Sequence, residues 1–328
     1  MAPTFLRFLS RLGSALALGT AAATAFAHPS YPDKPIRIVV PYPPGGTADI
    51  LGRLLAERLA PELEQPVLVE NRAGGGTAIG ARFVATASAD GYTLFVGTST
   101  SHAINPALQA DIGYDPVRDF TAVAAIAEVP YVIVAHPKRG FRALKDLVAY
   151  ARAHPGELNY SSAGTGSSNH LGGELLASVE RIRITHIPYK GSAPALNDLL
   201  AGQVDFMFDL APTAQQHIRA GKLTALAVTA GQRSAVLPDV PTAAEAGVPG
   251  AQITAWFGIF GPARLPASIQ QRLAQALSAV LAQPDTRKRL ADLGTEVMNQ
   301  QGDAFQAFVA QDYAHWKTLV AQAGIKAD

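Results

Sequence analysis

Short apolar runs alternate with segments of helical periodicity along the chain. Residues 36–40 form an apolar run typical of a buried strand, and Ile50, Leu54, Leu55 and Leu59 then recur at the spacing of one helix face. Helices are also predicted over residues 77–87 and 144–153, and three helical stretches end the chain. Further strands are predicted at residues 67–69, 92–97, 158–161, 184–188, 204–208, 223–228, 253–260 and 295–298.

Strands that alternate with helices predict an α/β fold with mostly parallel sheets. Residues 122–135 are apolar but contain Glu128 and Pro130, and we interpret them as a pair of strands that meet at a crossing point. Residues 253–260 then return to the first domain. At 328 residues the chain is long enough for two domains. We therefore predict two hinged lobes, the first from residues 28–125 plus 250–328 and the second from residues 126–249.

The first 27 residues predict export. Arg7 and Arg11 precede an apolar stretch without acidic residues that ends in Ala25-Phe26-Ala27, the pattern of a secretory signal cleaved after Ala27. An N-terminal membrane anchor is the alternative, although the stretch is short for a span. The mature protein is therefore expected to be exported.

Composition and motif spacing exclude several kinds of chemistry. The net charge is +1 with both signs spread along the chain, which argues against a nucleic-acid partner. The chain has no cysteine, hence no disulfide or thiolate site, and no histidine spacing predicts a metal. The glycine-rich segments at residues 74–80 and 164–169 do not fit G-x-G-x-x-G or a P-loop, so no nucleotide cofactor is expected. A dispersed Ser-His-Asp site in a secreted hydrolase stays open, with Ser168 as a candidate nucleophile.

Several Gly/Ser/Thr-rich loops follow predicted strands and precede predicted helices. Such loops present backbone N–H groups, and the helix that follows adds unpaired donors and partial positive charge, so they bind anions. The carboxyl ends of parallel strands converge, which would bring these loops to one cleft. The loops lie at residues 41–46, 71–76, 98–106 and 161–170.

Individual side chains near these loops leave alternatives open. Thr47 is the predicted cap of the first helix, with Asp49 in its first turn. Arg72 either reaches a ligand or pairs with Glu70 or Asp49. Lys190 is expected to pair with a carboxylate such as Asp205. Tyr189 is a candidate to lie against a ligand. Asp209 either accepts from a ligand amine or caps the helix at Pro212, and Trp256 is expected to pack in the core or hinge.

The chain resembles a known family along nearly its whole length. It is similar to the extracytoplasmic solute receptors of tripartite tricarboxylate transporters, the Bug receptors. The matching segments are YP at 31–32, PYPPGGTAD at 41–49, VENRAGGG at 69–76, ADGYTL at 89–94, PYKGS at 188–192, LLAGQVD at 199–205 and WFGIFGP at 256–262. Each segment alone is weak evidence for the family, but the occurrence of all of them in this order is specific to it.

The resemblance implies a two-lobed periplasmic binding protein fold of type II that holds a small carboxylate in the cleft between its lobes. It implies a monomer without cofactor or metal that delivers its ligand to membrane permease subunits and has no catalytic activity. A ligand sensor for a regulatory system uses the same closed state, so that role stays open. Position by position, the resemblance nominates as ligand-binding residues Tyr42, Gly45, Gly46, Thr47, Thr98, Ser99, Ser161, Gly164, Thr165, Ser168, Tyr189 and Asp209.

Overall fold

One ten-stranded mixed sheet connects both halves of the fold. The computed structural model describes residues 31–109 and 111–323, so the predicted signal segment and its cleavage site at Ala27 lie outside the described residues. The strand order is β2-β1-β3-β9-β4-β7-β5-β6, with β8 and β10 also paired to β4. The strands are β1 (Ile36–Val40), β2 (Val67–Asn71), β3 (Thr93–Thr98), β4 (Phe120–Ala135), β5 (Asn159–Ser162), β6 (Thr185–Pro188), β7 (Phe206–Leu210), β8 (Thr224–Val228), β9 (Thr254–Pro262) and β10 (Glu296–Val297).

Helices follow the strands as the periodicity predicts. The predicted helix at residues 144–153 is confirmed with both ends unchanged, whereas the one predicted at 77–87 is shorter. The loop predicted at residues 98–106 is wrong, because most of it is helical. The helices are α1 (Thr47–Leu63), α2 (Ala78–Ala85), the π-helix η1 (Thr100–Ile104), α3 (Asn105–Leu108), the 3-10 helix η2 (Pro137–Arg139), α4 (Leu144–Ala153), α5 (Ser168–Glu180), α6 (Ser192–Leu200), α7 (Ala211–Arg219), α8 (Ala267–Ala282), α9 (Pro284–Asp292) and α10 (Gly302–Ala323).

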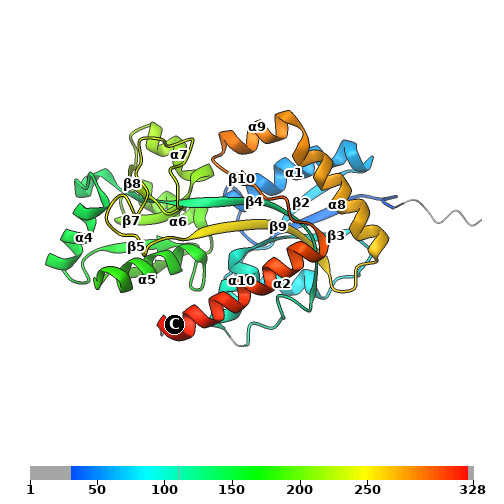
Figure 1. The fold of residues 1–328 in the computed structure, drawn as a ribbon, viewed down its shortest axis with the longest axis horizontal. Coiled ribbons are helices and arrows are strands. Elements are labelled where there is room, and N and C mark those ends of the chain that lie inside the picture. The colour runs from blue at the N-terminus through cyan, green and yellow to red at the C-terminus, as the bar shows by residue number, and fades with distance from the viewer. Residues whose placement is uncertain (1–30, 110, 324–328) are drawn as a thin grey trace, which may run out of the picture. The chain divides into compact units, whose positions relative to one another are not determined.

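Two long strands join the halves (Figure 1). Residues 122–135 were expected to be a pair of strands, but β4 is one continuous strand that passes through Pro130. Its first part pairs with β9 as far as Pro130, and from Tyr131 onward it pairs with β7. Proline is tolerated where a strand changes partners, because no ladder hydrogen bond depends on its missing N–H. The predicted crossing strands are thus β4 and β9.

Each half has its own parallel strands and its own apolar core. In the first lobe β1 pairs in parallel with β2 and β3, around a core that includes Val39, Phe95 and Phe260. In the second lobe β5 pairs in parallel with β6 and β7, around a core that includes Leu199 and Met207. The predicted two-lobed α/β fold is confirmed, and the parallel strands of each lobe end at the loops that were predicted to bind an anion.

Candidate functional site

A cleft pocket lies where the loops of both lobes and the two crossing strands meet. It encloses a cavity of about 30 Å³, which corresponds to about two water-sized spheres. None of the residues described around this cavity carries a charged side chain. The lining residues are Tyr42, Pro43, Gly46, Thr47, Ala48, Thr98, Tyr131, Ala163, Asn169, Ser192, Leu210, Ala255 and Phe257.

Four helices begin at this pocket. Thr47 and Ser192 are the first residues of α1 and α6, Asn169 is the second residue of α5, and Leu210 is the N-cap of α7. Each N-terminus has backbone N–H groups without partners inside its helix and carries partial positive charge. An anion in the pocket would therefore meet converging N–H dipoles rather than an arginine or lysine.

The first of these loops is held by Asp49. Gly46, not Thr47, is the N-cap of α1, and no side chain caps that helix, so the predicted cap is wrong. Instead Asp49 accepts hydrogen bonds from Gly45 N at 3.0 Å, Arg53 Nε at 3.0 Å and Asn71 Nδ2 at 2.9 Å. Burial opposes ionisation of Asp49, but these hydrogen bonds, led by the one from Arg53, outweigh it and keep its pKa below the usual value. The charge of Asp49 is thus neutralised locally.

The loop after β3 faces the first loop. Tyr42 Oη lies 3.3 Å from Thr98 Oγ1, and both side chains line the pocket. Burial raises the pKa of Tyr42, against the opposing hydrogen bonds from Thr100 and Thr98, so its hydroxyl is a neutral hydrogen-bonding group at the pocket wall.

Hydroxyl groups connect the two lobes beside the pocket. Ser168 Oγ lies 3.1 Å from Ser99 Oγ and 2.8 Å from Thr100 Oγ1, and Ser168 N donates to Thr100 Oγ1 at 3.1 Å. The predicted residues Ser99 of the first lobe and Ser168 of the second lobe are therefore brought together. Their hydroxyl groups contact each other across the lobes, and neither residue lines the pocket. These contacts surround the Ser168 hydroxyl with other hydroxyls, an environment unlike that of a nucleophile with a histidine base.

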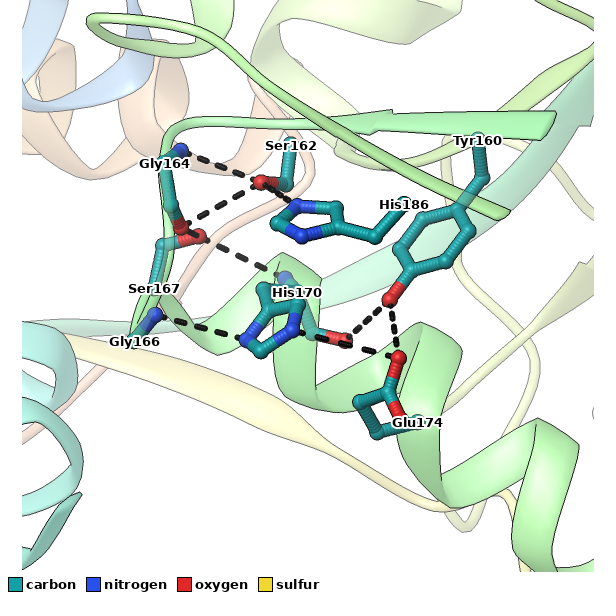
Figure 2. A network of polar contacts seen from close by, with 8 residues as sticks. All are labelled: Tyr160, Ser162, Gly164, Gly166, Ser167, His170, Glu174 and His186. Carbon is teal, nitrogen blue, oxygen red and sulfur yellow. Dashed lines mark hydrogen bonds and ion pairs between the residues drawn. The ribbon is translucent and has the colours of Figure 1, made fainter. Parts of the chain in front are cut away.

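A buried polar network shapes the loop after β5 (Figure 2). Ser162 Oγ accepts from Gly164 N at 3.0 Å and lies 2.5 Å from His186 Nε2. Ser167 Oγ donates to Gly164 O, and His170 Nδ1 accepts from Gly166 N at 3.3 Å. Burial, and then the charge of neighbouring His170, lowers the pKa of His186 to about 3, so His186 is neutral near pH 7. The network fixes the loop without presenting charge to the pocket.

The loop after β5 also touches the opposite lobe. A Cβ on Gly76 would lie 3.0 Å from the carbonyl oxygen of Thr165, and one on Gly166 would lie 2.6 Å from Asn105 Oδ1. Gly164 has a φ of +122°, which favours glycine at this turn. The predicted residue Thr165 thus stands at a close approach of the two lobes, whereas Gly164 contacts Tyr189 of its own lobe. The predicted residue Ser161 is buried and bonds to Ala195 O.

In the loop after β6 one prediction is wrong, and another, the ligand role of Tyr189, stays a prediction. Tyr189 Oη donates to Asp198 Oδ2 at 2.6 Å, and this side chain is not in the pocket lining. Burial and the hydrogen bond to Asp198 raise the pKa of Tyr189 to about 12. The expected pairing of Lys190 with Asp205 is wrong, because Asp205 Oδ1 accepts from Arg139 Nε at 2.7 Å. Gly191 in this loop packs against Pro43 of the first lobe.

Two open questions about side chains are resolved. Arg72 pairs with Glu70, and its guanidinium lies 3.6 Å from the centre of the Phe83 ring. Trp256 is buried, as expected, and its Nε1 donates to Asp312 Oδ2 at 2.7 Å.

Asp209 lies at the end of β7, directly before the pocket-lining Leu210. It is 1% exposed, and its Oδ2 has no hydrogen-bond partner among the described residues. Burial raises its pKa to about 7, against the opposing contacts of the Thr213 side chain and the Leu210 backbone. The N-cap of α7 is Leu210 and no side chain caps that helix, so the predicted capping role of Asp209 is wrong. Its part in ligand binding stays a prediction.

Four predicted residues line the pocket, namely Tyr42, Gly46, Thr47 and Thr98. The rest surround it or hold its loops, and their part in ligand binding stays a prediction. The sequence reasoning missed Tyr131, Ser192 and Phe257. Tyr131 directly follows Pro130 in the predicted crossing segment, a signal that could have placed it at the cleft.

Two further classes of site are absent from the described part of the chain. Residues 31–109 and 111–323 contain no cluster of three or more His, Asp or Glu side chains that could hold a metal ion. Among the same residues, no helix combines the length and the apolar character that a membrane span requires.

Comparisons with known proteins agree with this geometry. Residues 51–325 match the model of the tripartite tricarboxylate transporter family receptor. The protein BugT of Bordetella pertussis is 36% identical over 321 residues, which cover 98% of each chain. An R. palustris protein solved with adipate superposes with a TM-score of 0.87 at 37% identity, covering 90% of this chain and 99% of that one. MatC from Rhodopseudomonas palustris with bound malate gives a TM-score of 0.84 at 37% identity, covering 88% of this chain and all of that one.

Proposed function

The chain belongs to the tripartite tricarboxylate transporter receptor family, and on that premise we propose that it captures a small organic carboxylate in the cleft pocket for delivery to a membrane permease. The observation that carries this proposal is the pocket itself, where four helix N-termini converge and no lining side chain is charged. Backbone dipoles worth about 0.3–2 kcal/mol each can together bind one carboxylate group.

The pocket supports a ligand with one carboxylate held deep in the cleft. The cavity of about 30 Å³ accommodates a carboxylate group but not a six-carbon diacid. The related structures contain adipate and malate. We infer that this chain binds acids of the same class and that its lobes separate to admit them. The change of strand partner between Pro130 and Tyr131 is the proposed hinge, and it moves the boundary of the second lobe from residue 126 to about residue 131.

The remaining features of the proposal follow from the receptor role. The mature protein would act in the periplasm after cleavage near Ala27, as a monomer and without catalytic activity. The ligand would be bound by the predicted residues that line the pocket, with Ser99 and Ser168 closing the lobes beside it. Membrane permease subunits are the proposed partners.

A thermal-shift screen tests the ligand class. The purified mature protein is heated with malate, adipate, citrate, benzoate and aspartate in turn. A ligand at 100 times its Kd should stabilise the protein by about 2.7 kcal/mol. If every acid left Tm unchanged, the proposed function would be refuted.

A variant of Gly46 tests the location of the site. A Cβ added at Gly46 would meet no atom within 4 Å, and the backbone there is in an ordinary extended conformation, so Gly46→Val fills the pocket without backbone strain. We expect at least about tenfold weaker binding by calorimetry, or about 1.4 kcal/mol, with an unchanged Tm. The matched control is Gly231→Val, on an exposed loop with equal room. Equal affinity in both variants would remove the first loop from the site.

A further inference from the structure

Three aspartates are buried in the described residues, and only one of them lacks a cation. Asp49 bonds with Arg53, and Asp205 bonds with Arg139. Asp209 is as buried as Asp205, yet no described Lys, Arg or His bonds or ion-pairs with it, and its Oδ2 has no partner at all. An ionised carboxylate in that environment is unfavourable, because neither water nor a counter-charge compensates it.

Asp209 lies next to the proposed ligand without touching the cavity. It pairs with Val132 of β4 and is followed by Leu210, and both Leu210 and the neighbouring Tyr131 line the pocket. Burial raises the pKa of Tyr131, and a hydrogen bond from Ser168 opposes this shift. The charges of Tyr42 and Asp209 also raise it, so Asp209 is near enough to the pocket wall to interact with it electrostatically. Asp209 therefore adjoins the pocket through the lining residues Leu210 and Tyr131.

Among the described residues, the side chains that interact with Asp209 supply no positive charge. Tyr131 on β4 is a neutral phenol, and Thr213 on α7 is a hydroxyl. A carboxylate ligand would bring a second negative charge into this surrounding, and two like charges at short distance disfavour double ionisation.

We propose that Asp209 is a positioning residue that takes up one proton from solvent when a carboxylate ligand binds, so that the cleft accepts anions without a counter-cation. The inference rests on the proposed function. Proton uptake keeps the net charge of the buried region constant for a ligand with a single buried carboxylate.

Binding should therefore depend on pH. Below pH 7 Asp209 is already protonated in the free protein, whereas above pH 7 each binding event must take a proton from solvent. Linkage then predicts about tenfold tighter binding of malate or adipate at pH 6 than at pH 8. Burial lowers the pKa of the fully buried His102 and of the half-buried His186 to about 3, so neither titrates in this range.

Calorimetry of the mature protein measures both effects. Malate and adipate are titrated at pH 6 in Bis-Tris and at pH 8 in both HEPES and Tris, because the difference in buffer ionisation heat at pH 8 reports the number of protons taken up. The expected result at pH 8 is an uptake approaching one proton per ligand. Asp209→Asn should abolish the uptake and flatten the pH profile. The control Asp292→Asn removes an exposed carboxylate paired with Lys288, and it should keep both the proton uptake and the pH dependence of binding.

The outcomes separate this inference from the proposed function. Binding of malate or adipate without proton uptake and without pH dependence in the unmodified protein would overturn the role of Asp209 and leave the receptor role intact. The same holds if aspartate bound far more tightly than both acids and Asp209→Asn lost that binding, since Asp209 would then be an ionised partner of an ammonium group. If no carboxylate bound, the proposed function would fail and this inference with it. The measurement on the unmodified protein is decisive even if Asp209→Asn folds poorly.

Discussion

The two ends of β7 each have a buried aspartate, and the structure treats them in opposite ways. Asp205, directly before the strand, accepts from Arg139 Nε at 2.7 Å and from Asn159 N at 3.0 Å. Asp209, near the other end, has an oxygen without any partner among the described residues. Both side chains are about 1% exposed, so burial does not distinguish them. The difference is the presence of a cation and of donors.

The difference in partners indicates that the Asp205 end of β7 serves the stability of the lobe, whereas the Asp209 end lies at the ligand pocket. At the Asp205 end, the η2 helix and the first residue of β5 supply donors from the same lobe, so the carboxylate is satisfied whenever that lobe is folded. At the Asp209 end, the strand points to a cleft whose other wall belongs to the other lobe. Groups at this end face lining residues of the first lobe across the pocket. Substitutions at the first end should therefore reduce stability, and substitutions at the second should change affinity and its pH dependence.

The largest expected effect is the cost of ionising Asp209. Its pKa of about 7 in the folded protein exceeds the usual value near 4, so the folded state binds this proton more tightly than the unfolded state. The stabilisation is complete below about pH 4 and is lost as pH rises through 7, with an upper limit of about 4 kcal/mol. About 1.4 kcal/mol of this falls between pH 6 and pH 8. Urea unfolding at both pH values should show that loss in the unmodified protein and not in Asp209→Asn; parallel pH profiles would contradict it.

The next effect is the loss of the ion pair at the other end. Arg139→Met leaves the buried Asp205 without its cation, and we expect a stability loss of about 3 kcal/mol in urea unfolding at pH 7. The control is Arg233→Met, which breaks an exposed pair with Glu245 and should cost less than about 1 kcal/mol. Ligand affinity should be unchanged in both variants. Equal losses of stability in Arg139→Met and Arg233→Met would show that the buried ion pair of Asp205 contributes no more to stability than an exposed ion pair.

A smaller effect is expected where the lobes meet. Gly191 has a φ of +134°, and a Cβ there would lie 2.4 Å from Pro43 Cδ in the opposite lobe. Gly191→Ala should cost about 1–3 kcal/mol through backbone strain, and the contact with Pro43 should also weaken ligand binding. The control Gly221→Ala has a positive φ and no neighbour within 4 Å, so it should lower Tm without changing affinity. Calorimetry that gave both variants the same affinity would argue against closure at this contact.

The smallest effect concerns the hydroxyl bridge between the lobes. Ser168→Ala removes the side-chain contacts with Ser99 and Thr100, and we expect about fivefold weaker ligand binding, equivalent to about 1 kcal/mol. The control Thr86→Ala removes a hydroxyl that bonds only to the backbone one turn earlier, and it should bind as the unmodified protein does. Binding that was unaffected in Ser168→Ala would show that the bridge does not stabilise the bound state.

The positions of most strands followed from sequence, because a run of apolar residues bounded by turn residues has few alternatives. The strands occur within two residues of their predicted ends. The exception is β4, where Glu128 and Pro130 suggested a break. Glu128 is tolerated because it accepts a hydrogen bond from Thr254, and Pro130 stands where the strand changes partners. Both reasons are tertiary, so no local pattern could have revealed them.

The site was predicted in part for the same reason. The sequence by itself determined the order of the strands and helices, the absence of cysteine chemistry and the Gly/Ser/Thr loops at the strand ends, since these depend on residue type and spacing. Only the tertiary structure decided that Tyr131 lines the pocket, that Ser99 meets Ser168, and that Arg139 rather than Lys190 pairs with Asp205. It also decided that Asp209 has no counter-charge among the described residues. Such contacts join segments that are far apart in the sequence, and the packing of the two lobes decides which of these segments lie close together.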